Sequence, residues 1–180
     1  YLGDELDGGI LAALNTRYII ESQDVACLTA EYTGVDPYGA AWFVGDVVVC
    51  DAPRGELEML GQVALDSCAV VGAAVEGLEA TYATEGSIEL VEYAPNRLLY
   101  EYEAAEPVLA VFSEIYFPDG WSVYVDGKEA SYFAADYTLR GMKLPVGSHV
   151  VEWKFRAPGW GVATAITGIC SWLILLGMVV

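Results

Sequence analysis

The alternation of apolar and polar residues in the second half of the chain constrains its fold more than any other feature. Three segments alternate with a period of two residues: 98–103, 121–126 and 151–156. This period is typical of β-strands with one buried face. The stretch 108–117 is apolar on both faces except at Ser113 and Glu114. It therefore predicts a central strand between two layers.

Turn residues separate these predicted strands. Asp126-Gly127 is a strong signal for a two-residue hairpin, and the segment 145–147, Pro-Val-Gly, marks another turn. Strands at this spacing, with no helical pattern between them, predict a mainly β fold. We expect an antiparallel, jelly-roll-like β-sandwich built mainly from residues after Ser87.

The first half of the chain has a less regular pattern, and one or two short helices are expected there. Residues 4–15 fit a short helix with Asp4 as its cap, and residues 17–20 and 41–50 fit strands. Asp51 and Pro53 predict a cap and an early proline for a second helix that covers residues 56–62. The small apolar stretch 68–77 fits either a strand or a turn.

The end of the chain carries no charge from residue 157 to residue 180. A bilayer core of about 30 Å needs roughly 20 helical residues, so this run predicts a transmembrane helix over 158–180 after a globular domain over 1–157. A buried core helix is the alternative. Because the chain starts at Tyr1 and stops within or just at the end of the run, we expect a fragment of a longer membrane protein. Lys154 and Arg156, just before the run, would place the domain in the cytoplasm by the positive-inside rule.

Charge and composition exclude several classes of function. With 26 acidic and 8 basic residues the net charge is −18, so nucleic acid is not expected as a partner. The chain has one histidine, His149, which rules out a site with two histidine ligands. His149 fits a surface strand position better than a general base. The cysteine spacings match no zinc or redox pair, and at most one disulfide could join Cys27, Cys50 and Cys68. We expect no metal and no cofactor.

Aromatic residues gather between positions 116 and 124. Such rings can stack on sugars or pack in a core, and strand alternation directs Trp121 inward. Tyr116 and Tyr124 are therefore the candidate glycan-binding residues. Asp119, Asp126 and Asp136 are too dispersed to supply the six or more oxygens that calcium takes.

Glu114 is a carboxylate in an otherwise apolar strand and should have a cationic partner. Arg140 stands between Leu139 and Gly141 in a predicted strand. We predict a structural ion pair between Glu114 and Arg140, with a catalytic acid at Glu114 as the alternative. A hydrolase using Glu114 with Asp126 would need the two carboxyl groups about 5 to 10 Å apart in an open cleft.

Several motifs occur together in a specific order. They are LNTRYII at 14–20, AWFV at 41–44, YAPNRL at 93–98, VFSEIYFPDGW at 111–121, VDGKE at 125–129 and YTLRG at 137–141, followed by Pro145, Gly147 and His149. This order resembles the C-terminal extracytoplasmic region of the YfhO-type bacterial membrane proteins. The resemblance covers nearly the whole chain, and its second half is the more specific part.

The resemblance implies a function that the residues alone do not indicate. YfhO-type proteins are polytopic membrane proteins similar to GT-C glycosyltransferases, which use polyprenyl-phosphate sugars outside the cytoplasmic membrane. Their catalytic carboxylates belong to loops near N-terminal spans that this chain lacks, so no catalytic residue is expected here. The resemblance places the domain on the periplasmic side, against the flanking charges.

Three functions follow as hypotheses. The first is an accessory domain that shapes the acceptor side of cell-envelope glycan transfer, with the rest of the parent protein, the lipid bilayer and a cell-envelope glycan as partners. The second is a non-catalytic, membrane-anchored glycan-binding or adhesion module. The third is the autonomous hydrolase.

Overall fold

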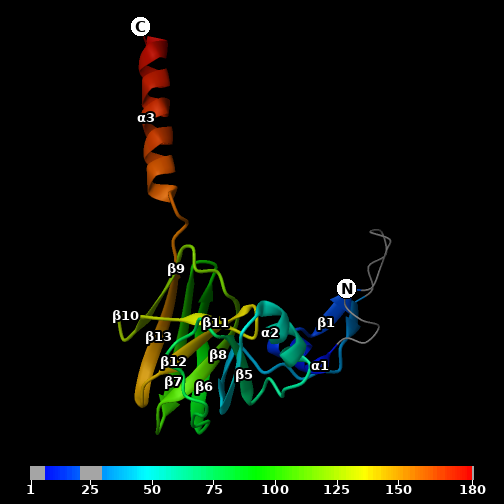
Figure 1. Ribbon diagram of the computed structural model, residues 1–180. Coiled ribbons are helices and arrows are strands. Elements are labelled where there is room, and N and C mark those ends of the chain that lie inside the picture. The colour runs from blue at the N-terminus through cyan, green and yellow to red at the C-terminus, as the bar shows by residue number, and fades with distance from the viewer. Residues whose placement is uncertain (1–6, 21–29, 180) are drawn as a thin grey trace.

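The computed structural model describes residues 7–20 and 30–179, which form a mainly β chain with few helices (Figure 1). In chain order the elements are α1 (Gly8–Ala13), β1 (Tyr18–Ile20), β2 (Ala30–Tyr32), β3 (Ala41–Val44), β4 (Asp46–Cys50), α2 (Pro53–Leu60), β5 (Cys68–Gly72), β6 (Gly86–Ala94), β7 (Arg97–Ala104), β8 (Val108–Ile115), β9 (Trp121–Val125), β10 (Lys128–Ala130), β11 (Phe133–Ala135), β12 (Leu139–Leu144), β13 (Gly147–Phe155) and α3 (Trp160–Val179). Two large sheets have the strand orders β10-β9-β13-β7-β6 and β3-β8-β12-β11-β5-β4, and β1 pairs with β2 in a small ribbon.

The two large sheets pack against each other through a shared aromatic core. Tyr100 of β7 and Trp153 of β13 each meet the ring of Phe112 on β8 edge-on, with centroids 5.0 and 5.3 Å apart. All three side chains are completely buried. The alternation predicted for residues 98–103 is confirmed, because Leu98, Tyr100 and Tyr102 are buried while the residues between them face outward.

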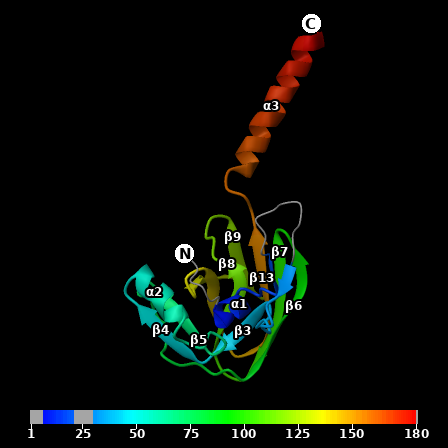
Figure 2. The same cartoon turned by 90° about the vertical axis from the view of Figure 1, so that its right-hand side faces the viewer.

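Strand β8 lies between two apolar layers, as its sequence predicts. Val108, Ala110 and Phe112 face the core between the sheets. Leu109 and Val111 face a second core, which α1 and α2 cover on the other side of the six-stranded sheet (Figure 2). All five side chains are fully buried, so β8 has no solvent face until it reaches Ser113.

The six-stranded sheet curls strongly, because its two edge strands are joined by one residue. The predicted strand 41–50 is divided at Gly45 into β3 and β4, which lie at opposite edges of the same sheet. Two Cα steps of about 3.8 Å limit the distance between Val44 and Asp46 to about 7.6 Å. The sheet therefore forms a half-barrel in which the edges approach each other at Gly45.

The expectation that both large sheets are antiparallel and built mainly from residues after Ser87 is wrong for the six-stranded sheet. Strands β4 and β5 pair in parallel, with Asp46 opposite Cys68 and Cys50 opposite Gly72. A parallel pair needs a crossover, and α2 supplies it. The undecided stretch 68–77 thus begins with a buried strand, and three of the six strands of this sheet precede Ser87.

The capping residues of both short helices differ from those predicted. The side chain of Asp7 caps α1 by accepting a hydrogen bond from the amide of Ile10, at 3.0 Å. The predicted cap, Asp4, lies outside the described residues. Pro53 lies at an early position of α2 as predicted, but the helix covers Pro53–Leu60 rather than 56–62. Its cap position is Ala52, and no side chain caps it. Asp51 is therefore not a cap.

The hairpin predicted at Asp126-Gly127 is confirmed. Both residues have positive φ angles, 50° and 76°, and they join β9 to β10 with Val125 opposite Lys128. Positive φ at both central residues is the requirement of a type I′ turn, whose twist matches that of the two flanking strands.

Helix α3 stands away from both sheets, and its described side chains are exposed (Figures 1 and 2). Within the part of the chain that the structure describes, no helix meets the length and apolarity of a candidate membrane span. The prediction of a transmembrane helix over 158–180 is therefore not supported, although the segment is helical. Small and hydroxylated residues lower the apolarity of residues 160–171: Gly161, Thr164, Thr167, Gly168 and Ser171.

Two glycines with positive φ provide a matched test of this fold. Gly127 lies at the open hairpin tip, where a Cβ would meet nothing within 4 Å. Gly86, with φ 141°, starts β6, where a Cβ would overlap the backbone carbonyl of Glu103. We expect Gly127→Ala to lower the free energy of unfolding by about 1 kcal/mol. Gly86→Ala should lower it by about 3 kcal/mol or more. Urea unfolding measures both, and equal losses would contradict the strand register described for β6 and β7.

Candidate functional site

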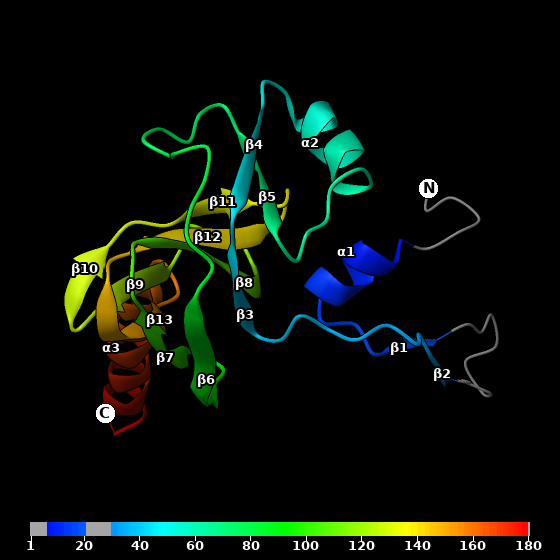
Figure 3. The same ribbon diagram turned by 90° about the horizontal axis from the view of Figure 1, so that it is seen from below.

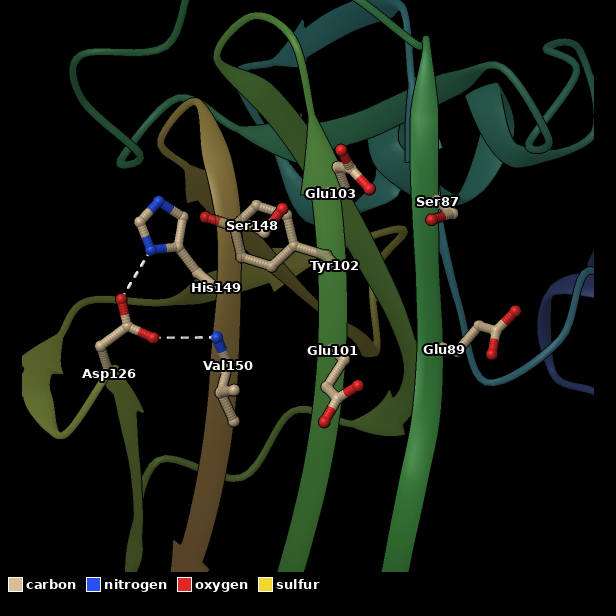
Figure 4. A pocket seen from close by; sticks show the side chains of 9 residues that line it. All are labelled: Ser87, Glu89, Glu101, Tyr102, Glu103, Asp126, Ser148, His149 and Val150. Carbon is tan, nitrogen blue, oxygen red and sulfur yellow. Dashed lines mark hydrogen bonds and ion pairs between the residues drawn. The ribbon is translucent and has the colours of Figure 1, made fainter.

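A shallow pocket of about 430 Å³ lies on the outer face of the five-stranded sheet, beside the tip of the β9–β10 hairpin (Figure 4). Strand register arranges most of its lining in two rows. One row runs from Ser87 through Glu103 to Ser148, and the other runs from Glu89 through Glu101 to Val150. Tyr102, Asp126 and His149 complete the lining.

The pocket is acidic and rich in hydrogen-bond acceptors. Glu89 and Glu101 lie directly opposite each other on neighbouring antiparallel strands, and Glu103 lies on the same face two residues further along. Like charges in directly opposed positions are unfavourable, and only their exposure to water makes the arrangement tolerable. The surface therefore suits ligands that offer several hydrogen-bond donors.

His149 is held at the edge of this pocket by two acceptors. Its Nδ1 lies 2.6 Å from Oδ2 of Asp126, and its Nε2 lies 3.0 Å from the carbonyl oxygen of Val146. A carbonyl oxygen only accepts, so Nε2 carries a proton, and the carboxylate favours a proton on Nδ1 as well. The hydrogen bond to Asp126, followed by that to Val146, raises the pKa of His149 above its ordinary value.

Asp126 is the other half of this link. Its Oδ1 accepts a hydrogen bond from the amide of Val150 at 3.0 Å, and its Oδ2 accepts from His149. The Val150 amide, followed by His149, lowers the pKa of Asp126. Asp126 and His149 thus tie the hairpin tip to β13. With both ring nitrogens donating, His149 is not placed as a general base.

The remaining polar groups of the pocket show no activated nucleophile. Tyr102 donates its hydroxyl to the carbonyl of Pro145 at 3.0 Å, and burial raises its pKa to about 12. Among the described residues, no group of three or more His, Cys, Asp or Glu side chains could hold a metal ion. Cys50, Cys68 and Cys170 are free thiols, and Cys27 lies outside the described residues.

The structure does not join Glu114 to Arg140 in a direct ion pair. Arg140 is 2% exposed, and its Nε donates to the carbonyl oxygen of Ile115 at 3.0 Å. Its guanidinium lies over the rings of Trp121 and Trp153, at 4.3 and 4.8 Å from their centroids. Burial raises the pKa of Glu114, and the charge of Arg140 opposes that rise. The two charges interact through space, but two indole rings and a carbonyl are the direct partners of Arg140.

Tyr116 and Tyr124 lie in different surroundings. Tyr116 is half-buried against the ring of Tyr132, with centroids 5.5 Å apart. Tyr124 lies on the outer face of β9, where the ammonium group of Lys154 is 5.1 Å from its ring centroid. Of the two, Tyr124 lies on the same sheet face as the acidic pocket. Both remain predictions as glycan contacts.

The carboxyl pair of the hydrolase hypothesis is separated by the length of β12. Glu114 precedes Ile115, which pairs with Leu139 at the start of β12. Asp126 is linked through His149 to Val146, just after the end of β12. Six strand residues at about 3.3 Å each span roughly 17 to 20 Å, which is well beyond the 5 to 10 Å that glycoside hydrolysis requires.

Sequence reasoning missed the acidic pocket, although part of its signal was present. Glu101 and Glu103 are the outward positions of the alternation over 98–103, a pattern that by itself indicates only which face is buried. The row that adds Ser87, Glu89 and Ser148 depends on the pairing of β6, β7 and β13. No pattern within one strand reveals that pairing.

Substitutions of Arg140 test how much its contacts with the two indole rings contribute to stability. Arg140→Lys removes the planar group that stacks on two indoles and the donor to Ile115, so the free energy of unfolding should fall by about 2 kcal/mol. Arg140→Met keeps an unbranched side chain and removes the buried Nη1, which has no hydrogen-bond partner, so its loss should be smaller. Urea unfolding distinguishes the two variants. An unchanged stability for Arg140→Lys would show that the cation–π contacts contribute little.

The pKa shifts of His149 and Asp126 predict the pH range in which the hairpin tip is most stable. The raised pKa of His149 means that its stabilisation is complete below about pH 6.5 and is lost as pH rises through the raised value. The lowered pKa of Asp126 means that its stabilisation is present above about pH 4 and is lost as pH falls through the lowered value. The tip should therefore be held best between about pH 4 and 6.5.

Nuclear magnetic resonance measures both the protonation of His149 and the opening of the hairpin tip. We expect protons on both ring nitrogens of His149 at pH 6, and faster exchange of the Val150 amide, corrected for its chemical rate, at pH 8.5. His149→Gln should abolish this difference, and the neighbouring Ser148→Ala should preserve it. A His149 pKa at or below 6.5 would contradict the geometry.

The comparisons with known proteins do not assign the chain to a family. No protein-family model, no curated protein and no solved structure matches it.

Proposed function

We propose that the chain is a non-catalytic accessory domain of a larger YfhO-type membrane protein and that it lies on the extracytoplasmic side of the bacterial cytoplasmic membrane. In this proposal the parent protein resembles GT-C glycosyltransferases, and the domain shapes the acceptor side of cell-envelope glycan transfer. The fold is then a jelly-roll-like β-sandwich to which the half-barrel sheet adds a helix-covered layer. The proposal does not depend on α3 crossing a membrane.

The acidic pocket is the observation that carries the proposal. Its carboxylates and serine hydroxyls come from neighbouring strands of one sheet face, and a glycan could donate its hydroxyl hydrogens to them along two rows. Hydrogen bonds to charged acceptors are stronger than those between neutral groups. Tyr124 lies on the same face and offers a ring for stacking on a sugar.

The chemistry of the pocket also favours binding over turnover. His149 donates from both ring nitrogens, Tyr102 has a high pKa, and Glu114 lies at the far end of β12. The net charge of −18 is unfavourable for a polyprenyl diphosphate or a nucleotide sugar. Donor binding and catalysis are therefore assigned to the rest of the parent protein.

The same face supports the second hypothesis, a glycan-binding or adhesion module without a catalytic parent. Both hypotheses predict glycan binding, but they differ in the consequence of deletion. Removal of the domain from a glycosyltransferase parent should impair glycan transfer, whereas removal from an adhesion protein should impair attachment alone.

Titration of the chain with cell-envelope oligosaccharides, followed by amide chemical shifts, tests the proposal. We expect saturable shifts at Glu101, Glu103 and Ser148, and no transfer or hydrolysis of polyprenyl-phosphate sugars or glycosides. Loss of one charged acceptor in Glu101→Gln should weaken binding about tenfold. Glu106→Gln, at an exposed position outside this pocket, is the matched control. Glycoside turnover that Glu114→Gln abolishes would overturn the proposal in favour of a hydrolase.

A further inference from the structure

A second large pocket, of about 640 Å³, lies where the chain crosses from the five-stranded sheet to the six-stranded sheet, between β10 and β11 (Figure 3). Its wall comes from the β9–β10 hairpin, the crossover after β10, the end of β12 and the loop 76–78. Asp126 and His149 also line the acidic pocket, so the two pockets share the hairpin tip as a wall. The volume is within the range of ordinary small-molecule sites, about 300 to 1,000 Å³.

Strand pairing explains why the fold is open at this place. Strand β10 pairs with β9 as far as Ala130, whereas β11 begins to pair with β12 at Phe133, opposite Gly141. Strand β12 continues beside β8 to Leu144, but no described strand borders residues 142–144 on the other side. The two sheets therefore part beside an open edge of β12, and the pocket lies there.

Apolar side chains of both cores line this pocket. Val125, Ala130 and Met142 belong to or pack against the core between the sheets, and Leu78 and Phe133 pack against the core under α1 and α2. All of these side chains except that of the buried Met142 are half-buried, so each keeps part of its apolar surface free. The pocket can therefore enclose the apolar body of a ligand.

Lys143 of β12 brings a positive charge to the wall. Its Nζ donates to the carbonyl oxygen of Gly77 at 2.8 Å, which ties the loop 76–78 to the strand. An ammonium group has three donors, so this hydrogen bond leaves two for other acceptors. Lys143 is exposed, and among the described residues it forms no ion pair with a carboxylate.

Lys128 of β10 is the second cation, and strand alternation directs it to the inner side of the hairpin. Two residues after it, Ala130 pairs with the buried Val123, so Lys128 and Ala130 share the side that faces the six-stranded sheet. Glu129, between them, pairs with Tyr124 and shares its outer face. In the part of the chain that the structure describes, Lys128 also has no ion pair.

The carboxylates of the wall leave both ammonium groups available. The two oxygens of Asp126 are used by His149 and by the amide of Val150, and Lys128 acts on this carboxylate only through space. Glu76 is an exposed loop residue without an ion pair to any described residue. Acidic residues outnumber basic ones by 26 to 8, so carboxylates are abundant in this chain. Two lysines left without one in the same pocket have free capacity for an anionic ligand.

We propose that this pocket binds a small carboxylic acid with an apolar body, whose carboxylate lies between the ammonium groups of Lys128 and Lys143. Charge-assisted hydrogen bonds hold the head, and the side chains of both cores enclose the body. The net charge of −18 repels an anion at long range, but physiological salt screens charges beyond about 8 Å, so the two nearby lysines dominate. The site does not depend on the proposed glycan binding at the acidic pocket.

A comparison of octanoate with octanamide tests the proposal on the full chain. The two probes have the same number of non-hydrogen atoms and differ in the charge of the head. By calorimetry at pH 7 and low salt, octanoate should bind at least about tenfold more tightly, and about 0.5 M sodium chloride should reduce this preference. Amide shifts are expected at Val125, Ala130 and Lys143, and none at Ser87 in the acidic pocket. Equal affinities, or no binding of octanoate, would overturn the proposal.

A pair of charge variants separates the pocket from the net charge of the chain. Lys128→Gln removes one ammonium group from the wall, so octanoate should bind about fivefold more weakly while octanamide is unaffected. Arg54→Gln changes the net charge by the same amount at an exposed position of α2 outside this wall, and it should alter neither affinity. Equal effects of the two variants on octanoate would mean that bulk charge alone is sensed, which would refute the proposal.

A filled pocket and direct contacts locate the apolar body. Ser131→Trp enlarges an exposed side chain of the wall and should weaken the binding of both probes. With octanoate at saturation, nuclear Overhauser effects should join its methylene protons to the methyl groups of Leu78 and Val125 and to the ring of Phe133. Undiminished binding to Ser131→Trp, or the absence of these contacts, would place the ligand elsewhere and contradict the proposal.

Discussion

The burial of Trp153 and Phe112 between the two large sheets is the contact on which the rest of the structure depends. Their rings meet at 5.3 Å, and Tyr100 packs on Phe112 from the same layer. This cluster fixes which face of each strand points inward, since a shift of one residue would exchange every buried side chain for an exposed one. Arg140 enters the same layer and lies over Trp153, where aromatic faces replace the water that its charge loses on burial.

The inward faces determine what the two outer faces can do. On the five-stranded sheet the outward residues remain in water, and their carboxylates and hydroxyls form the acidic pocket beside the hairpin tip. On the six-stranded sheet the outward residues are apolar and need a cover, which α1 and α2 provide. The cover is incomplete at the turn 136–138, where an apolar pocket remains beside Asp136. One domain thus carries a polar surface for binding on one side and a small apolar cavity on the other.

Local patterns predicted the elements whose stability is local. The alternation around Tyr100, the two apolar faces of β8 and the hairpin at Asp126-Gly127 each depend on residues close in sequence, and all three are confirmed. The predictions that failed depended on distant partners. An ion pair was expected for Arg140 because the sequence could not show that two indoles would cover its guanidinium. The parallel pairing of β4 with β5 was missed because neither strand indicates its neighbour.

The sequence by itself determined that the chain is mainly β, where its tightest hairpin lies and which side chains are buried in its central strands. These properties follow from backbone preferences and from a period of two, which act over a few residues. The tertiary structure alone decided that one residue, Gly45, joins the two edges of a curled sheet. It also decided that carboxylates from neighbouring strands share a pocket and that one oxygen of Asp136 is buried without a partner. Such arrangements are set by the packing of segments far apart in sequence, because burial and pairing are properties of the surroundings that a residue meets only after the chain has folded.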